Sequence, residues 1–536
     1  MRRMSLVVII VVLGAGVTAQ DHQHAVDRLG TVHFETSCTA AAQPRVDRAL
    51  ALLHSFAFSG AVAAFNEALA ADPACAIAYW GLALSAWGNP FAAGLKPEAQ
   101  LQRGLDAVDR GRATGAKTDR ERGYIAAASR LFDDFRAIDQ RTRLLAYTDA
   151  MAALAARYPD DNEASIFYAL ALAISADPND KTYTNLLAAG AILEKLTAGQ
   201  PDHPGLAHYI IHSYDVPSLA SRALGAAHRY AAIAPGAPHA LHMPSHTFTR
   251  VGDWRESIKT NLASAAAARS EASTAEELHA TDYMMYAYLQ TGEDRAAQRL
   301  LSALPEIGRR FNPNALGGGA PPAAGYFALA AVPARYALER GAWREAMRLE
   351  VRRSPLPFAD AMTHFARALG ASRIGDTAIP KSAIAELQRI REQLASAKEA
   401  YWTQQVEIQQ RGASAWLAFA EGRKDEAVAE MRATADLEDA TEKNAITPGP
   451  IAPARELLGE MLLEVKRPVE ALREFERTLM KEPNRFRALA GAAKAATAAG
   501  EREAARKYYS QLLGIAARAD RPGRAELVDA RRSVAR

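Results

Sequence analysis

Two histidine pairs of identical spacing are the residues best suited to chemistry in this sequence. His208 and His212 lie four residues apart, and His242 and His246 repeat that spacing 34 positions later. Residues four apart share one face of a helix, so each pair can offer two ring nitrogens to a single metal ion. Of the 13 histidines in the chain, six fall between residues 203 and 242, and this clustering favours a shared role.

The helices that must position these pairs follow the same 34-residue period. A small residue is followed four and seven positions later by residues on the same helix face, and at several sites twelve positions later by proline. The small side chain lets two helices approach closely, and the proline ends the second of them. The pattern begins at Ala61, Ala189, Ala223, Ser257, Ala471 and Ala505. A composition rich in alanine, with few runs of Val, Ile or Thr, favours helix throughout.

This period, together with these landmarks, resembles the tetratricopeptide repeat (TPR). The resemblance implies an all-α fold, a right-handed α-solenoid of TPR-like antiparallel helix pairs arranged in two blocks. Four strings, Val32–Cys38, Leu52–Phe56, Asp72–Gly81 and Pro238–His246, also resemble a group of exported bacterial TPR proteins. Because that group has no established activity, the resemblance assigns no catalytic residue.

In repeats of this kind, the fifth and ninth positions of each first helix point into the concave groove where ligands bind. With the small residue set at position 20, these positions fall on both histidine pairs and then on Asp282 and Tyr286. Side chains from two packed helices, about 8–10 Å apart, can converge on one ion. The sequence therefore predicts a metal site formed by His208, His212, His242, His246 and Asp282, with His239 and His279 as partners behind the ligands. Imidazole with carboxylate suits zinc, copper, iron or nickel.

Further residues are expected in or near the groove: His54, Trp80, Asp215, Tyr286, Glu456 and Glu460. An aromatic side chain there can grip an apolar or sugar-like group, although a place in the core is the commoner role. The two glutamates can face the histidines across the superhelix or be solvated helix charges. Pro244 removes an intrahelical hydrogen bond, so a kink is expected between His242 and His246.

The first residues predict export to the periplasm or the exterior. Arg2 and Arg3 precede an apolar run, Leu6–Val12, and the small-residue sequence ending at Ala19 is typical of a signal-peptide cleavage site. An oxidising compartment permits a disulfide between Cys38 and Cys75, the two cysteines of the chain; the alternative is two separate thiols.

Breaks in the repeat pattern divide the chain. The clearest is the Gly- and Pro-rich stretch after Asn312, which predicts a loop between two repeat blocks. The predicted divisions are a signal peptide (1–19), an N-terminal segment (20–43), an N-terminal repeat block (44–310), a loop or linker (311–325), a C-terminal repeat block (326–520) and a charged tail (521–536).

Charge and missing motifs exclude several classes of function. The formal charge of +3 includes Arg2 and Arg3, so the mature chain carries 3 − 2 = +1, with both signs interleaved. Nucleic acid is therefore a poor partner, and no later apolar stretch is long enough to span a membrane. The Gly-x-Ser-x-Gly elbow, the phosphate-binding loop and His-Glu-x-x-His are all missing from the sequence.

Two functions remain. The first is an exported TPR scaffold that binds a protein or peptide partner in its concave groove. The alternative is a metal-binding protein or metal-dependent enzyme that uses the histidine cluster, where a metal-activated water would be the nucleophile. If the protein is instead the scaffold, the histidines hydrogen-bond a peptide in the groove or have a structural role. Whether the protein is an enzyme stays open at this point.

Overall fold

The computed structural model describes residues 28–92, 94–315 and 318–535, so the predicted signal peptide lies outside the described residues. Over these ranges all regular structure is helical and no strand occurs, which confirms the predicted all-α class. In the same ranges, no helix has the length and apolar character needed to cross a membrane.

The N-terminal helices alternate in direction as a series of hairpins. They are α2 (Gln43–His54), α3 (Phe58–Ala71), α4 (Ala76–Trp87), α5 (Glu98–Thr114), α6 (Asp119–Ser129), α7 (Gln140–Arg157), α8 (Asn162–Ile174) and α9 (Thr184–Thr197). The middle helices are α10 (Pro204–Ser213), the short 3₁₀ helix η1 (Ala220–Ala223), α11 (Leu224–Ile233), α12 (Pro238–His242), α13 (Pro244–Val251), α14 (Trp254–Ser270), α15 (Thr274–Thr291) and α16 (Asp294–Arg310).

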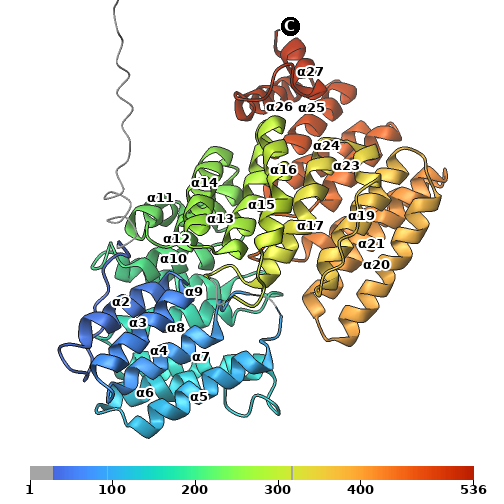
Figure 1. The fold of residues 1–536 in the computed structure, drawn as a ribbon. Coiled ribbons are helices and arrows are strands. Elements are labelled where there is room, and N and C mark those ends of the chain that lie inside the picture. The colour runs from blue at the N-terminus through green and yellow to red at the C-terminus, as the bar shows by residue number, and fades with distance from the viewer. Residues whose placement is uncertain (1–27, 93, 316–317, 536) are drawn as a thin grey trace, which may run out of the picture.

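The C-terminal helices continue the array. They are α17 (Pro322–Glu339), α18 (Trp343–Met347), α19 (Pro357–Arg373), α20 (Ala378–Ser396), α21 (Ala400–Ala420), α22 (Lys424–Asp439), α23 (Ala454–Glu464), α24 (Pro468–Lys481), α25 (Phe486–Ala499), α26 (Arg502–Ile515) and α27 (Ala525–Val534). In Figure 1 the chain passes from blue helices at one end, through the green middle helices, to orange and red ones.

Consecutive helices pack against each other along most of the chain, as expected of stacked helix hairpins. The small residues that define the repeat pattern are all buried in these contacts. Gly81, near Ala78 on α4, shows how close the helices come, because a Cβ there would lie 2.1 Å from the ring of Phe65 on α3. Small side chains at the crossings thus permit the tight TPR-like stacking.

The hydrophobic interior divides into two large clusters. One spans Leu29 to Phe248 and the other spans Ala320 to Ala530, with smaller clusters between them on α14 to α17. The predicted linker, residues 311–325, is shorter than expected, since α17 already begins at Pro322. Helix α15 packs directly on α17, so the stack continues across this loop.

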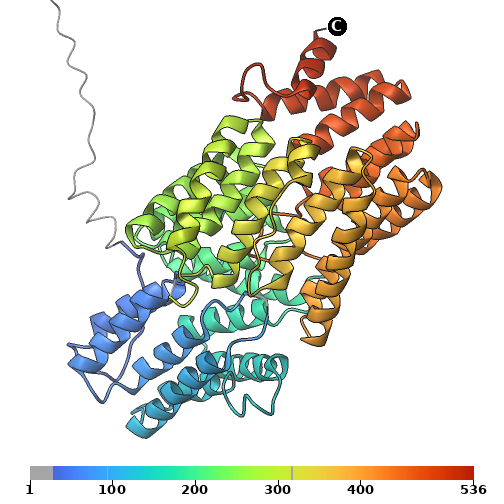
Figure 2. The ribbon, with the colours of Figure 1, turned by 45° about the vertical axis from the view of Figure 1, so that its right-hand side comes forward.

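The C-terminal half also folds back onto the middle helices. Trp254 Nε1 donates a hydrogen bond to the backbone oxygen of Asn484, at 2.8 Å. Arg524 pairs with Asp294 across a similar separation in sequence. Figure 2 shows the green and yellow helices lying beside the orange and red ones after a 45° turn. The middle helices are thereby covered on a face that an open solenoid would leave to solvent.

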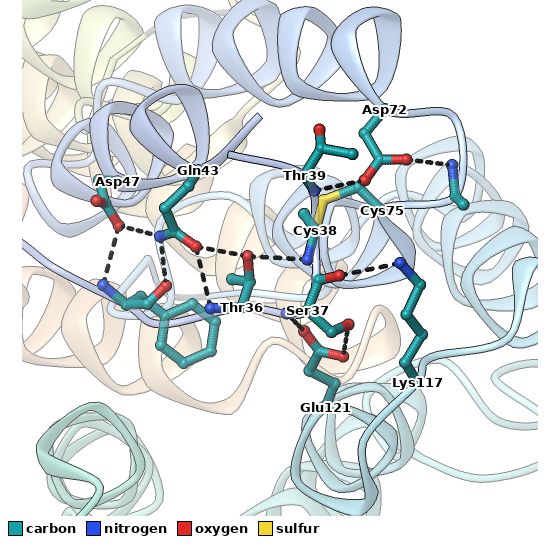
Figure 3. The surroundings of a disulfide bond; sticks show 12 residues. Thr36, Ser37, Cys38, Thr39, Gln43, Asp47, Asp72, Cys75, Lys117 and Glu121 are labelled. Carbon is teal, nitrogen blue, oxygen red and sulfur yellow. Dashed lines mark hydrogen bonds between the residues drawn. A yellow bond between two sulfur atoms is a disulfide. The ribbon is translucent and has the colours of Figure 1, made fainter. Parts of the chain in front are cut away.

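A disulfide fastens the segment that precedes α2. Cys38 and Cys75 are bonded, with their Cα atoms 4.9 Å apart (Figure 3). Beside the bond, the backbone N–H of Thr39 donates to Asp72 at 2.7 Å, and that of Ser37 donates to Glu121 at 2.7 Å. The leading segment is therefore held against the N-termini of both α4 and α6.

Candidate metal centre

A break in one helix brings the second histidine pair together. Pro244 has no N–H to donate, and the helix divides there into α12 and α13. The expected interruption lies between His242 and His246, although Met243 keeps helical torsion angles. His242 ends α12 and His246 lies in the first turn of α13, and their Nε2 atoms face each other at 3.1 Å.

His279, on α15, completes a first group of three imidazoles. One nitrogen from each of His242, His246 and His279 lies within 4.8 Å of the other two. The ring centroids of His242 and His279 are 4.3 Å apart. All three side chains are buried. We call this group the inner trio; its helices lie in the green to yellow-green part of Figure 1.

Polar partners behind His242 and His246 fix where their protons are. Asn261 on α14 donates through Nδ2 to the backbone oxygen of Ser257, so its Oδ1 must accept the 2.6 Å hydrogen bond from His242 Nδ1. Asp215 accepts from His246 Nδ1 at 2.9 Å. With both Nδ1 atoms donating, each neutral ring carries a lone pair on Nε2.

The charge state of these groups follows from burial and from neighbouring cations. Lys443 and Arg250 both pair with Asp215, at 2.9 and 2.8 Å, and keep its pKa well below the ordinary value although burial opposes this. Burial lowers the pKa of His242 well below its ordinary value and that of His246 to about 4. Burial therefore favours the neutral form of both rings, and in that form the two Nε2 atoms, 3.1 Å apart, each carry a lone pair.

A second group lies beside the first. His208 and His212 on α10 and His239 on α12 also bring one nitrogen each to within 4.8 Å of the others. We call this group the outer trio. His208 Nδ1 donates to the backbone oxygen of His54 at 2.6 Å, which leaves its lone pair on Nε2. Within the described residues, the Nε2 atoms of all three rings have no hydrogen-bond partner.

Burial and aromatic neighbours surround His208 and His212, two rings of the outer trio. Desolvation lowers the pKa of both His208 and His212 well below the ordinary value. The ring of Phe91 stacks on His212 with centroids 3.9 Å apart, and Phe56 lies 4.3 Å from His208. His239 Nδ1 lies 3.4 Å from a carboxylate oxygen of Glu276, beyond good hydrogen-bond geometry.

A third group has a different character. His54 and His203 each bond one carboxylate oxygen of Glu163 through Nε2, at 2.9 and 2.8 Å. His54 Nδ1 bonds the hydroxyl of Tyr209 at 3.0 Å. These contacts occupy both ring nitrogens of His54 and both carboxylate oxygens of Glu163, so His54, expected in the groove, belongs to a hydrogen-bonded network.

The other residues predicted for this site take roles that differ from the prediction. Asp282, predicted as a ligand, pairs instead with Arg335, at 2.8 Å. His239 and His279, expected behind the ligands, lie within the trios themselves. The sequence held a signal that His239 belongs to the site, because it lies three residues before His242 and so on the same helix face. Asp215 lies beside the cluster, where it supports His246.

Most of the residues expected to line an open groove are buried instead, and Glu460 is half-buried. Trp80 packs among the rings of Phe34, Tyr124 and Phe167 in the N-terminal core. Tyr286 donates to Glu482 at 3.0 Å. Glu456 pairs with Arg485 at 2.8 Å, and Glu460 pairs with Arg487. The expectation of an open groove wall was therefore wrong for Tyr286, which contacts the C-terminal half, and that of a solvated charge was wrong for Glu456, which is buried in an ion pair.

The chain shows only limited similarity to known proteins. No protein-family model matches the chain, and no curated protein matches it. Solved structures with similar architecture include a human IFIT1 dimer with PPP-AAAA, at 12% identity and a TM-score of 0.40, covering 90% of this chain and 96% of that one. Another is the APC/C hetero-tetramer Cut9-Hcn1, at 13% identity and a TM-score of 0.35, covering 92% and 90%.

The TPR domain of P58(IPK) is a third, at 15% identity and a TM-score of 0.21, covering 70% of this chain and 98% of that one. Likeness of this degree carries no argument about function. The chain's own helix pairs and their regular repeat define it as an all-helical, TPR-like repeat protein.

Proposed function

We propose that this TPR-like protein binds a transition-metal ion through its buried imidazoles, with the inner trio as the primary site. The observation that carries the proposal is the 3.1 Å separation between the Nε2 atoms of His242 and His246, whose Nδ1 atoms both donate to other groups. Neutral nitrogens that both lack a proton repel each other at 3.1 Å unless a cation lies between them. Nitrogens about 2.0–2.1 Å from a tetrahedral zinc ion are about 3.3 Å apart, which is close to that separation.

The surroundings of the trio support the proposal. A metal-binding histidine commonly donates its other N–H to a carboxylate, a carbonyl or an amide oxygen, and this fixes the ring orientation. His242 and His246 each have such a partner, Asn261 and Asp215. Three imidazoles leave a fourth coordination position open, as in catalytic metal sites. Zinc, copper, nickel and iron all suit imidazole ligands.

The peptide-groove alternative has less support. The residues expected to line such a groove are buried in the core or in ion pairs, and so are the histidines themselves. Binding of a protein partner elsewhere on the TPR-like surface is compatible with a metal centre, since the two would use different residues.

Elemental analysis of protein purified without a histidine tag tests the proposal. We expect at least one zinc, copper, nickel or iron ion per chain, and loss of the inner-trio ion in the double variant His242→Gln/His246→Gln. His228→Gln is the matched control, because His228 is exposed and lies outside both trios. Protein that stays free of all four metals, even after incubation with each and desalting, would refute the proposal.

We also propose that the protein is exported. The signal-like first residues and the Cys38–Cys75 bond support an oxidising compartment. Intact mass of the protein recovered from its native cells should correspond to a chain that begins at Gln20. A mass that retains residues 1–19 would contradict cleavage at this site.

A further inference from the structure

We propose that the protein holds two metal ions in one centre, one in the inner trio and one in the outer trio. This inference rests on the proposed metal-binding function and extends it.

The outer trio offers lone pairs of its own. The backbone oxygen of His54 can only accept a hydrogen bond, so His208 Nδ1 must be the donor and Nε2 must carry the lone pair. Among the described residues, nothing bonds that Nε2 or the Nε2 atoms of His212 and His239. One nitrogen of each ring lies within 4.8 Å of one nitrogen of the other two. Because buried polar nitrogens are nearly always bonded, three unbonded ones in such a group point to a ligand.

A single ion cannot use all six imidazoles. Nitrogens around an octahedral ion, with bonds of about 2.1 Å, lie at most about 4.2 Å apart. The nitrogens of the two trios do not form one group even at a limit of 4.8 Å; within the described chain they form two separate groups of three. Either one trio coordinates an ion and the other three rings do not, or each trio coordinates an ion of its own.

Each trio has its own polar support, as two independent sites require. Behind the inner trio lie Asn261 on His242 and Asp215 on His246. Behind the outer trio, the backbone oxygen of His54 holds His208, and Glu276 lies 3.4 Å from His239. One carboxylate therefore lies beside each trio: Asp215, which also pairs with Lys443 and Arg250, and Glu276. The third group, in which Glu163 bonds both rings directly, lacks this arrangement.

The two trios are close enough to form one centre. The ring centroids of His212 and His246 are 5.9 Å apart, and those of His239 and His242 are 6.0 Å apart. These distances between trios match the 6.2 Å between His246 and His279 within the inner trio. Ions in two-metal sites lie about 3.5–4 Å apart and act together on one bound group. The geometry therefore accommodates a pair of neighbouring ions.

The stoichiometry of zinc in the full-length protein tests this inference. After incubation with excess zinc and desalting, we expect two zinc ions per chain. The variant His208→Gln/His212→Gln and the variant His242→Gln/His246→Gln should each retain one. One ion in the unmodified protein would overturn the second site and leave the proposed function intact, whereas no ion would overturn both. Because the unmodified protein decides between these results, a variant that fails to fold does not block the test.

Copper tests whether the sites are neighbours. Two copper(II) ions a few ångströms apart couple magnetically, so the electron paramagnetic resonance signal per copper should be much weaker in the unmodified protein than in either variant. The His228→Gln protein should behave as the unmodified one. Two full, independent copper signals would show separate sites and would overturn the shared centre.

Discussion

At the scale of single residues, the orientation of each imidazole depends on side chains that do not themselves face the site. Asn261 is the clearest example, because its amide is locked by Ser257 and leaves only one possible role for its oxygen. A carboxylate at the same place would keep the acceptor, whereas an apolar side chain would leave His242 free to rotate or to change its protonated nitrogen. Asn261 is therefore a positioning residue.

We expect Asn261→Leu to weaken zinc binding by about 10- to 100-fold, the usual effect of removing a partner behind a metal ligand. Asn261→Asp should bind within a few-fold of the unmodified protein, because it retains the acceptor. Competition with a chelator of known affinity gives the measurement. Thr260→Ala serves as the control, since Thr260 donates to the backbone of its own helix. Equal affinity in the Leu and Asp variants would contradict the positioning role.

The sequence could predict four of the six clustered histidines from their register alone. His208, His212, His242 and His246 follow from the helical spacing within each pair and the repeat spacing between the pairs, which depend only on helix and repeat geometry. Asp282 shares that register, but Arg335 on α17 takes its carboxylate in an ion pair. Such a partner has no fixed spacing from Asp282, so the repeat pattern holds no sign of it.

At the scale of the elements, α10 reaches the end of α2 because residue 205 has no side chain. A Cβ at Gly205 would lie 2.5 Å from His54 Nδ1, and His54 both bonds Glu163 and offers its backbone oxygen to His208. The close approach of these two helices therefore positions His208, a member of the outer trio, against the end of α2.

We expect Gly205→Ala to destabilise the protein by about 1–3 kcal/mol, the usual cost of overpacking a filled interior. Gly225→Ala on α11 is the matched control: a Cβ there meets nothing within 4 Å, so alanine should be neutral or stabilise by up to about 1 kcal/mol. Chemical denaturation of both variants measures the difference. A Gly205→Ala protein as stable as the control would show that the helices can separate freely.

The repeat period was sufficient to predict the elements but not how they close on one another. Helix pairs are local, and small residues and prolines mark their crossings and ends. The covering of Tyr286 and Glu456 depends on a small rotation at every repeat, summed along the stack. No single residue determines the total rotation, so the sequence contained no local feature to show that the groove is closed.

At the scale of the whole molecule, the disulfide ties the leading segment, which precedes α2, to the N-terminal block. The bond joins residues 37 apart. A cross-link over a loop of this length stabilises a protein by about 2–4 kcal/mol, chiefly by restricting the unfolded chain. Aromatic contacts of Phe34 with Trp80 and Tyr124 add to the attachment and do not depend on the bond.

We expect the double variant Cys38→Ser/Cys75→Ser to unfold at a lower temperature than the unmodified protein. Adding a reductant should lower the Tm of the unmodified protein to that of the variant and should leave the variant unchanged. Differential scanning calorimetry with and without reductant makes the comparison. Equal Tm values under oxidising conditions would show that the non-covalent contacts of the leading segment are sufficient.

The docking of the C-terminal half has a kinetic consequence. The imidazoles of the inner trio come from residues 242–279, yet Lys443 bonds the carboxylate behind them and the hydroxyl of Tyr283 beside them donates to Thr447. The contacts from Lys443 and Thr447 therefore form only when the C-terminal half docks onto the middle helices. Docking of this kind takes milliseconds to minutes in other proteins. If the inner trio binds an ion as proposed, an ion that enters before this step is enclosed by it, and its dissociation rate measures how often the two halves of the molecule separate.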